Sequence, residues 1–329
     1  MRRPKFPTVS VFSFGAGVQS TTILVLAARR EIPAPDYCVF SDPGAESPET
    51  IAHLERCKQF AEESGLRLVH LKPGDLGEDL LHDPKTFTSV PLFTTNEKGE
   101  PSGMLPRRCT KDYKIQPIET FIRREILALP KRKMVPRNVL VESWLGISED
   151  EEHRAKPPGL NVTRMRVVGE DNAGNPVKAR VTAWEPFRWL EKTYPLLGYR
   201  QRGDRTKVPD SRFRFCEGWD REDCLEYLDK HWGSPVPKSA CYFCPYRSGK
   251  EWSDMKANRP EEWARAVAWD EAIREAYKDG LRSIRGHLRG RVFVHPSRKP
   301  LRDAPLGGEA PRLGCGAKSD EEPDGICGV

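Results

Sequence analysis

Two periodicities of hydrophobic and polar positions run through the first half of the chain. An amphipathic pattern predicts a helix over residues 19–30, and Ser47 followed by Pro48 marks the start of another, because Ser is a favoured N-cap and Pro is favoured at the first helical position. Short apolar runs predict four buried strands, at residues 9–14, 36–40, 66–71 and 138–145. Strands that alternate with helices in this way are typical of an α/β fold with a parallel sheet between helices.

The pattern changes after about residue 150. Residues 160–185 predict a β-hairpin around an Asp-Asn-Ala-Gly-Asn turn, and two later segments, 219–231 and 258–279, predict helices. From Gly290 the chain has little periodic pattern. We therefore expect three parts: an α/β domain over residues 1–155, a smaller and mainly helical lobe over 156–288, and an irregular tail over 289–329.

Composition narrows the classes of protein. The 329 residues carry 54 Lys and Arg against 48 Asp and Glu, a net charge of +6 that allows an anionic partner without requiring one. The mean hydropathy is −0.64, and no apolar stretch reaches the length of a transmembrane helix. The charged N-terminus lacks the apolar run of a secretory signal, so we expect a cytoplasmic protein. Nine cysteines then favour metal or redox chemistry over a disulfide framework.

A glycine-rich loop joins the first predicted strand to the first predicted helix. Its glycines would let the backbone approach an anion, and the start of the helix would supply N–H groups and the positive end of the helix dipole. The same glycines could serve the turn alone, and the loop is not a Walker A loop, since no Gly-Lys-Ser/Thr follows. The predicted phosphate-binding residues are Ser13, Gly15, Gly17, Val18, Gln19, Ser20 and Thr21.

This loop resembles the pyrophosphate loop of the PP-loop ATP pyrophosphatases and of their relatives, the phosphoadenylyl-sulfate (PAPS) reductases. Gly15 stands where that family usually has Ser, and Gln19 where it often has Asp. The segment Ser41–Thr50 resembles the Asp-Thr-Gly-x-x-x-Pro-Glu-Thr segment of PAPS reductases, which implies that Asp42 and Gly44 lie near an adenosine. The resemblance implies a Rossmann-like domain of the adenine nucleotide alpha-hydrolase type that binds ATP, PAPS or adenylyl sulfate (APS), with Mg²⁺ as a candidate partner of the phosphates.

A third segment, Trp144–Arg154, follows the last of the four strands. It is similar to the Gly-Ile-Ser-x-Asp-Glu-x-x-Arg element of a phage- and actinobacteria-associated branch of the PAPS-reductase-like proteins. Open α/β sheets bind ligands at the carboxyl ends of their strands. We therefore expect Arg154 to contact substrate or phosphate, with a solvated acidic helix start, capped by Ser148, as the alternative.

The cysteines predict a metal site. Cys241 and Cys244 are spaced to bind one iron or zinc centre from a tight turn. Cys109 lies in a segment that looks like the [4Fe–4S]-ligating segment of PAPS-reductase relatives. Cys224 is the expected fourth ligand and Cys216 the runner-up; both could instead be ordinary buried thiols. A three-cysteine cluster whose open iron holds sulfide is a further possibility, and zinc remains an alternative to the [4Fe–4S] cluster. Neighbouring cations would offset thiolate charge or bind a phosphorylated substrate: Arg107, Arg108, Lys111, Lys114 and Arg247.

The tail contains two more cysteines. Cys327 looks like the counterpart of the nucleophilic Cys in the C-terminal Glu-Cys-Gly segment of PAPS reductases, although Ile326 replaces the Glu. Cys327 is therefore a predicted catalytic nucleophile, and Cys315 could act as its resolving thiol. The alternative is a tail in which both cysteines are incidental.

The resemblance, which spans most of the chain, implies three functions. The first is an ATP pyrophosphatase-type sulfurtransferase that adenylates a nucleobase, a nucleic acid or a small molecule. The second is a PAPS or APS reductase that forms sulfite at Cys327, and the third is a non-catalytic nucleotide- and cluster-binding component of a DNA-modification or phage-defence complex. A cysteine desulfurase or a thioredoxin-like reductant would be the partner. Residues 107–137 hold ten Lys or Arg against three Asp or Glu, which suits contact with tRNA or DNA or a solvated surface.

Overall fold

The computed structural model describes residues 7–82, 90–170, 176–276 and 290–307. Its centre is a seven-stranded sheet in the order β11-β10-β9-β6-β1-β2-β3. The pairs from β9 through β6 and β1 to β3 are parallel, and β10 and β11 add to β9 in antiparallel fashion. The strands are β1 (Val9–Ser13), β2 (Tyr37–Ser41), β3 (Leu68–Leu71), β6 (Val141–Leu145), β9 (Leu190–Tyr194), β10 (Tyr199–Gln201) and β11 (Lys207–Pro209). The four predicted strands are confirmed, and so is an α/β fold with a mostly parallel sheet.

Both faces of the sheet are covered at its centre, which is why the central strands β1 and β2 read as mostly apolar runs. In β1, Val11 packs with Ile118 and Ile122 on one face, while Phe12 packs with Leu24 on the other, and all are buried. The Phe12 side holds α1 (Val18–Ala28), α2 (Pro48–Glu63) and α5 (Arg221–His231). The Val11 side holds α4 (Gln116–Phe121), which continues at both ends into π-helical turns, Lys111–Ile115 and Ile122–Ile126.

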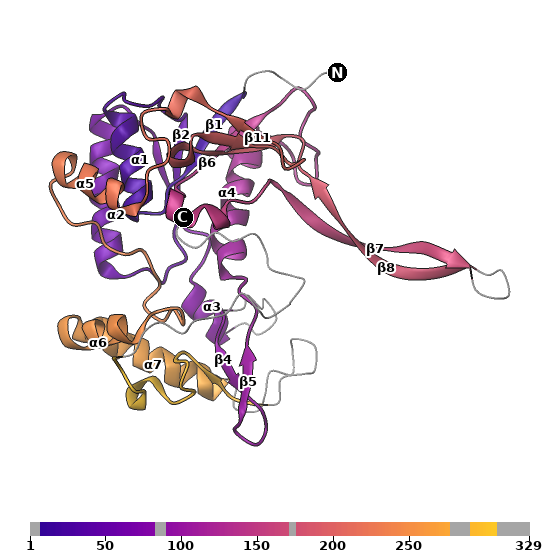
Figure 1. Ribbon diagram of the computed structural model, residues 1–329. Helices are drawn as coiled ribbons and strands as arrows, with labels where there is room; N and C mark the ends of the chain where they lie inside the picture. Colours follow the sequence, from indigo (N-terminus) through magenta and orange to yellow (C-terminus); the bar gives the residue numbers. More distant parts are fainter. Residues whose placement is uncertain (1–6, 83–89, 171–175, 277–289, 308–329) are drawn as a thin grey trace.

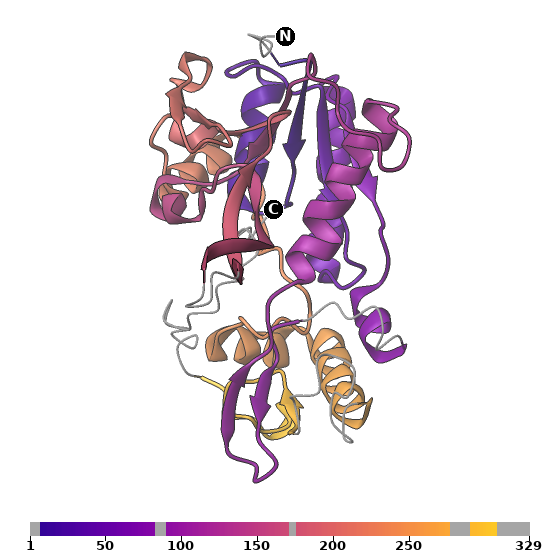
Figure 2. The same ribbon diagram turned by 90° about the vertical axis from the view of Figure 1, so that its right-hand side faces the viewer.

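A second body, drawn below the sheet in Figures 1 and 2, has its own core. Phe243 stacks on Trp269 with ring centroids 3.8 Å apart, and Trp252 is fully buried beside them. This lobe contains α3 (Leu76–His82), β4 (Phe93–Thr95), β5 (Pro101–Met104), α6 (Gly249–Asn258), α7 (Pro260–Ala276) and β12 (Val292–Phe293).

The expected boundary near residue 155 does not separate the two bodies. The sheet takes β9, β10 and β11 from beyond that boundary, and α5 packs against α1. The lobe in turn takes α3, β4 and β5 from before it, and adds Val292, Val294 and Leu301 from the expected tail. The division at 155 and 288 is therefore corrected, because the chain crosses between the bodies several times.

A β-ribbon extends from the sheet body. It pairs β7 (Gly159–Glu170) with β8 (Pro176–Pro186) as a separate two-stranded sheet, which confirms the predicted hairpin. Figure 1 shows the ribbon projecting well away from both bodies. The predicted helices at 219–231 and 258–279 are α5 and α7. No helix within the described ranges combines the length and the apolarity that a membrane crossing needs.

Candidate functional site

A cavity of about 340 Å³ lies between the carboxyl edge of the sheet and the second lobe. It begins where the loops after β1 and β6 leave neighbouring strands, the position at which open α/β sheets bind ligands. Three groups of residues predicted from the sequence line it together. They are the loop residues Gly17, Val18, Gln19 and Ser20, the cation Arg154, and the thiols Cys109, Cys241 and Cys244.

The first turn of α1 forms one end of the cavity. Gly17 is the N-cap, and its N–H donates to the hydroxyl of Ser20 over 3.0 Å, while that hydroxyl donates back to the Gly17 carbonyl. Ala16 has a φ of +53°, the left-handed conformation that turns the chain from β1 into the helix. No acidic side chain occupies the first turn of α1. The positive end of the helix dipole therefore faces the cavity without a counter-charge from α1 itself, which suits an anion.

Gly146 lets the loop after β6 approach this turn closely. A Cβ at Gly146 would lie 3.2 Å from the backbone nitrogen of Ser20, tighter than ordinary contacts. Gly146 lies within the Trp144–Arg154 segment, but no role was predicted for it. Its position directly after a strand was the available signal, because a larger residue there would push the two loops apart.

Gln19 ties the phosphate loop to the turn that carries Arg154. Its side-chain amide donates to the hydroxyl of Ser148 over 3.2 Å and to the carboxylate of Glu151 over 3.3 Å. Glu151 also forms an ion pair with Arg154. The segment Glu149–Arg154 is a 3₁₀ helix, and the expected cap by the Ser148 side chain is not formed.

Arg154 keeps one donor for a ligand. Its Nε is buried and makes no hydrogen bond with any residue in the described part of the chain. A buried donor without a partner is costly, and a bound phosphate oxygen would remove that cost. The guanidinium therefore adds a second anion-binding group to the cavity beside the start of α1.

The three cavity cysteines lie close enough to influence one another. A tight turn connects Cys241 to Cys244, with the Cys244 N–H donating to the Cys241 carbonyl over 3.1 Å. The pKa of Cys241 lies well above its usual range, chiefly because of burial and then because of Glu46, and the thiols of Cys244 and Cys109 act in the same direction. Lys114 opposes this rise. Because the pKa of Cys241 is raised, its thiolate would need a bound metal cation to stabilise it, and metal ligation in turn requires the deprotonated thiol.

A buried ion pair supports the cysteine turn from below. The Glu46 carboxylate, which is 4% exposed, pairs with Lys114 over 3.0 Å and accepts from the hydroxyl of Ser239 over 3.2 Å. The backbone of Glu46 forms a β-bridge with Cys241, and the Tyr242 N–H donates to the carbonyl next to Glu46. Glu46 was not predicted as a site residue, although it lies inside the Ser41–Thr50 segment. This segment thus positions the cysteines.

Arg247 has a structural part in the same turn. Its guanidinium donates to the carbonyls of Ala240 and Cys241, each over 3.2 Å, and pairs with Glu262 over 3.4 Å. It is 4% exposed and lies over the ring of Trp252. Arg247 was expected to offset thiolate charge or bind substrate, and it does line the cavity. Its hydrogen bonds, however, are spent on holding the backbone around Cys241.

Cys224 does not join the cavity cysteines, which corrects its prediction as the fourth ligand. It lies in the core between α1 and α5, and burial raises its pKa to about 12. Cys216 is in the same core, where its thiol donates to the Pro195 carbonyl over 3.5 Å. Both are buried thiols in apolar surroundings, the alternative given for them.

Asp42, Gly44 and Thr21 were predicted to bind nucleotide, and none of them lines this cavity. Asp42 accepts from the Gly44 N–H over 2.8 Å and contacts His70 over 3.0 Å. Gly44 has a φ of +74°, and a Cβ there would lie 2.9 Å from the Cα of Asp75, so only glycine fits. The Thr21 hydroxyl bonds to the His53 ring over 2.9 Å. The contacts of these three residues are therefore with the protein around them and not with this cavity.

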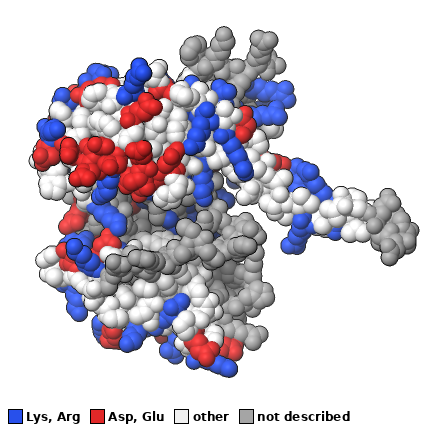
Figure 3. Space-filling model, in the orientation of Figure 1, with Lys and Arg blue, Asp and Glu red and all other residues white. Residues whose placement is uncertain are grey.

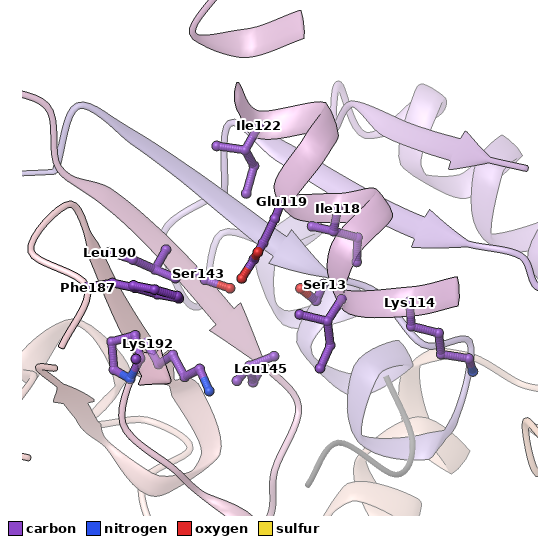
Figure 4. Close-up of a pocket in the computed structure, with 13 residues that line it drawn as sticks. Ser13, Lys114, Ile118, Glu119, Ile122, Ser143, Leu145, Phe187, Leu190 and Lys192 are labelled. Carbon is purple, nitrogen blue, oxygen red and sulfur yellow. The ribbon is translucent and has the colours of Figure 1, made fainter. Parts of the chain in front are cut away.

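Ser13 faces a second, much smaller cavity of about 50 Å³ on the α4 side of the sheet. Figure 4 shows Ser13 and Ser143 from β1 and β6, with Glu119 above them and Lys114 and Lys192 at opposite ends. Lys114 lines both cavities, so it connects them. Gly15 is buried in its loop and lines neither of these cavities.

The predicted tail cysteines, Cys327 and Cys315, lie outside the described residues. None of the seven described cysteines forms a disulfide. Among the described side chains, no group of three or more His, Cys, Asp or Glu could hold a metal ion. Cysteines that ligate an iron–sulfur cluster each bind a separate iron, so they stand farther apart than the ligands of one zinc ion.

Comparisons with protein-family models and with curated proteins return no match for this chain. The chemistry open to the site therefore follows from its contents. One end offers a helix N-terminus and a cation for phosphate, and the other offers three thiols for a cluster.

Proposed function

We propose that this protein is an ATP pyrophosphatase-type sulfurtransferase, with a fold of the adenine nucleotide alpha-hydrolase type. The observation that carries the proposal is the single cavity shared by the start of α1, Arg154 and three cysteines. A nucleotide-binding end and a thiol end within one space suit a reaction that first activates an acceptor and then delivers sulfur. The volume of about 340 Å³ is within the usual range of small-molecule sites.

The phosphate end would perform the activation. An acceptor oxygen attacks the α-phosphorus of ATP, its bond to that phosphorus forms, and pyrophosphate leaves with the electron pair. The N–H groups of Val18 and Gln19 would bind the phosphates, since that of Gly17 already donates to Ser20, and Arg154 would neutralise charge that develops on the leaving group. Gln19, held by Ser148 and Glu151, fixes the loop against the turn that carries Arg154. Mg²⁺ would be held through the nucleotide phosphates, with Glu151 as the nearest cavity carboxylate.

The thiol end would perform the delivery. Cys109, Cys241 and Cys244 would hold a [4Fe–4S] cluster, which when bound supplies an iron without a cysteine ligand at which sulfide can be kept. Lys114 and Arg107 line the same space, and their charges offset those of thiolates. Sulfide then displaces AMP from the adenylated acceptor, so that the acceptor carbon–oxygen bond breaks and a carbon–sulfur bond forms. A cysteine desulfurase is the class of partner that would supply the sulfur as a persulfide, and a thioredoxin-like reductant would supply the two electrons that convert it to sulfide.

The decisive experiment uses protein purified without oxygen and kept reduced. We expect AMP and pyrophosphate from ATP in the presence of a nucleic-acid pool and a sulfide source. Sulfite from PAPS or APS, without ATP cleavage, would overturn the proposal in favour of a reductase with Cys327 as its nucleophile. If neither reaction occurs, the protein is a non-catalytic nucleotide- and cluster-binding component.

A pair of variants tests the phosphate end itself. Arg154→Ala should reduce pyrophosphate release by about 100-fold, the usual cost of losing one group that stabilises transition-state charge, and should leave iron content unchanged. The matched control is Arg302→Ala, because Arg302 is an exposed cation paired with Glu271, remote from the cavity. An unchanged rate in Arg154→Ala would exclude Arg154 from the reaction.

A further inference from the structure

The β7–β8 ribbon and the groove at its base form a surface that the cavity chemistry does not use. The groove measures about 750 Å³ and lies where the chain enters β6 and β9, at the edge of the sheet opposite the cavity. We call this the basal groove. Its lining includes one acidic residue, Asp204, and five cations: Arg123, Arg132, Lys133, Arg137 and Arg188.

Cations continue from the basal groove along the ribbon. Arg164, Arg166, Lys178 and Arg180 are all exposed, and Arg164 pairs with Glu185 over 2.7 Å near the base. Figure 3 shows blue side chains along the ribbon and around its base, whereas red side chains gather on the part of the sheet body away from it. The charge is therefore sorted between two sides of the molecule, and the ribbon side suits a polyanion.

The strand register places cations and apolar side chains on both faces of the ribbon. Arg166 lies opposite Ala179 on one face, whereas Met165 lies opposite Arg180 on the other. Met165 and Val167 are each 59% exposed, so they do not pack on the protein itself. Because neither face is wholly apolar, the ribbon differs from the one-sided amphipathic elements that lie on membranes. A groove that surrounds the ribbon on both sides fits this arrangement better.

We propose that the ribbon and the basal groove bind double-stranded DNA, with the ribbon in the major groove and the basal groove on the adjacent phosphates. The major groove of B-form DNA, about 12 Å wide, admits a two-stranded β-ribbon. A strand of this length spans about 40 Å, enough to follow that groove across several base pairs. The cations would contact phosphates and base edges, and Met165 and Val167 would contact apolar base edges such as thymine methyl groups. The major groove of duplex RNA is too narrow and deep for side chains to enter, so DNA is the predicted duplex.

Binding can be measured without any turnover, so this proposal stands or fails separately from the sulfurtransferase. The full-length protein is titrated into a fluorescently labelled DNA duplex at several salt concentrations, and anisotropy gives the affinity. The same titration is made with an RNA duplex and with single-stranded DNA of identical sequence. We expect the DNA duplex to bind most tightly, with affinity that falls steeply as salt increases.

Two double variants locate the surface. Arg166→Ala with Arg180→Ala removes one cation from each face of the ribbon, and Arg132→Ala with Arg137→Ala removes two from the basal groove. Each should weaken DNA binding by about tenfold or more and make the salt dependence shallower by about two phosphate contacts. The matched control, Lys230→Ala with Lys250→Ala, removes two exposed cations from α5 and α6 and should change nothing.

Three results would overturn the proposal. They are equal binding by the ribbon variants and the control, tighter binding of the RNA duplex or single strand, and binding to vesicles of phosphatidylserine and phosphatidylcholine in preference to DNA. All substituted side chains are exposed or line an open groove, so thermal unfolding should show that the variants stay folded.

Discussion

Cysteines occur in two contrasting environments around α1, the cavity at its first turn and the core along its body. Its first turn faces the cavity, where Cys109, Cys241 and Cys244 are only partly buried and stand among cations. Its body faces a closed core, where Cys57 and Cys224 are fully buried. The cysteines at the cavity are the proposed cluster ligands, whereas those in the core are packing groups.

Electrostatics separates the two sides further. In the core, burial is the largest cause that raises the pKa of Cys57 and of Cys224 to about 12, and the thiol of Cys216 adds to the rise at Cys224. In the cavity, Cys241 is also affected by the neighbouring thiols and by Lys114, so a bound cation would change its titration directly. Because Cys224 also has a thiol neighbour, the cluster hypothesis rests on the open cavity and on the cations that line it.

A pair of cysteine variants gives the largest expected difference between the cavity and the core. Cys241→Ala should lose iron and sulfur transfer, because it removes one of three ligands. Cys224→Ala should keep full iron content and lower the free energy of unfolding by about 1–2 kcal/mol, the cost of a small cavity in the core. Iron and acid-labile sulfide are measured per chain after anaerobic reconstitution, and stability by denaturant unfolding. Iron loss in Cys224→Ala with full iron in Cys241→Ala would reverse the assignment.

The sequence could predict β1 and β2 because they are covered on both faces and so read as mostly apolar runs, and it could predict β6 from the apolar residues 139–141 at its start. It could not predict β9, whose Glu191 and Lys192 look exposed in the sequence. Both are buried in the structure, and Glu191 forms ion pairs with Arg200 and Arg202 on the antiparallel side.

The site divides in the same way. The glycine loop and the Cys241–Cys244 turn are local patterns, so the sequence alone could find them. The Glu46–Lys114 ion pair joins residues 68 positions apart, and nothing local marks it. Cys224 was chosen because it is close to Cys241 in sequence, but α5 carries it to the other side of α1. Closeness in sequence therefore gave a wrong prediction for Cys224, because the chain passes from the sheet body to the second lobe between Cys224 and Cys241.

The dependence of stability on pH tests the packing on the core side of α1, through His53. His53 of α2 is 3% exposed and bonds to Thr21 of α1, and burial lowers its pKa to about 4, with Arg56 acting in the same direction. The unfolded chain binds a proton below about pH 6.5, but the folded chain does so only near pH 4. The contribution of His53 is therefore present above pH 6.5 and falls as the pH drops toward 4, by about 2 kcal/mol between pH 7 and pH 5.

The measurement compares the wild type with His53→Gln. The free energy of unfolding is determined by denaturant titration at pH 7 and pH 5 for both proteins. The difference between them should shrink at pH 5, because only the wild type loses the His53 contribution. A difference that stays constant between these pH values would show that His53 titrates normally in the folded protein.

The smallest expected effect comes from the ion pair between Glu46 and Lys114 on the cavity side. Glu46→Gln removes the charge that faces Lys114 behind the cysteine turn, while a side-chain amide can still accept from Ser239. We expect a loss of about 1–2 kcal/mol in stability, less than for a fully buried pair because Lys114 keeps some exposure. The matched control is Glu55→Gln. Its partner Lys58 lies at the surface, 2.8 Å away, so this substitution should cost less than about 0.5 kcal/mol.

If the ion pair also positions the thiols, Glu46→Gln will bind iron more weakly than Glu55→Gln, so iron retention during dialysis against a chelator is measured beside unfolding. Equal stability and equal retention in the two variants would mean that the cysteine turn is held by Arg247 and the backbone bridge without help from Glu46.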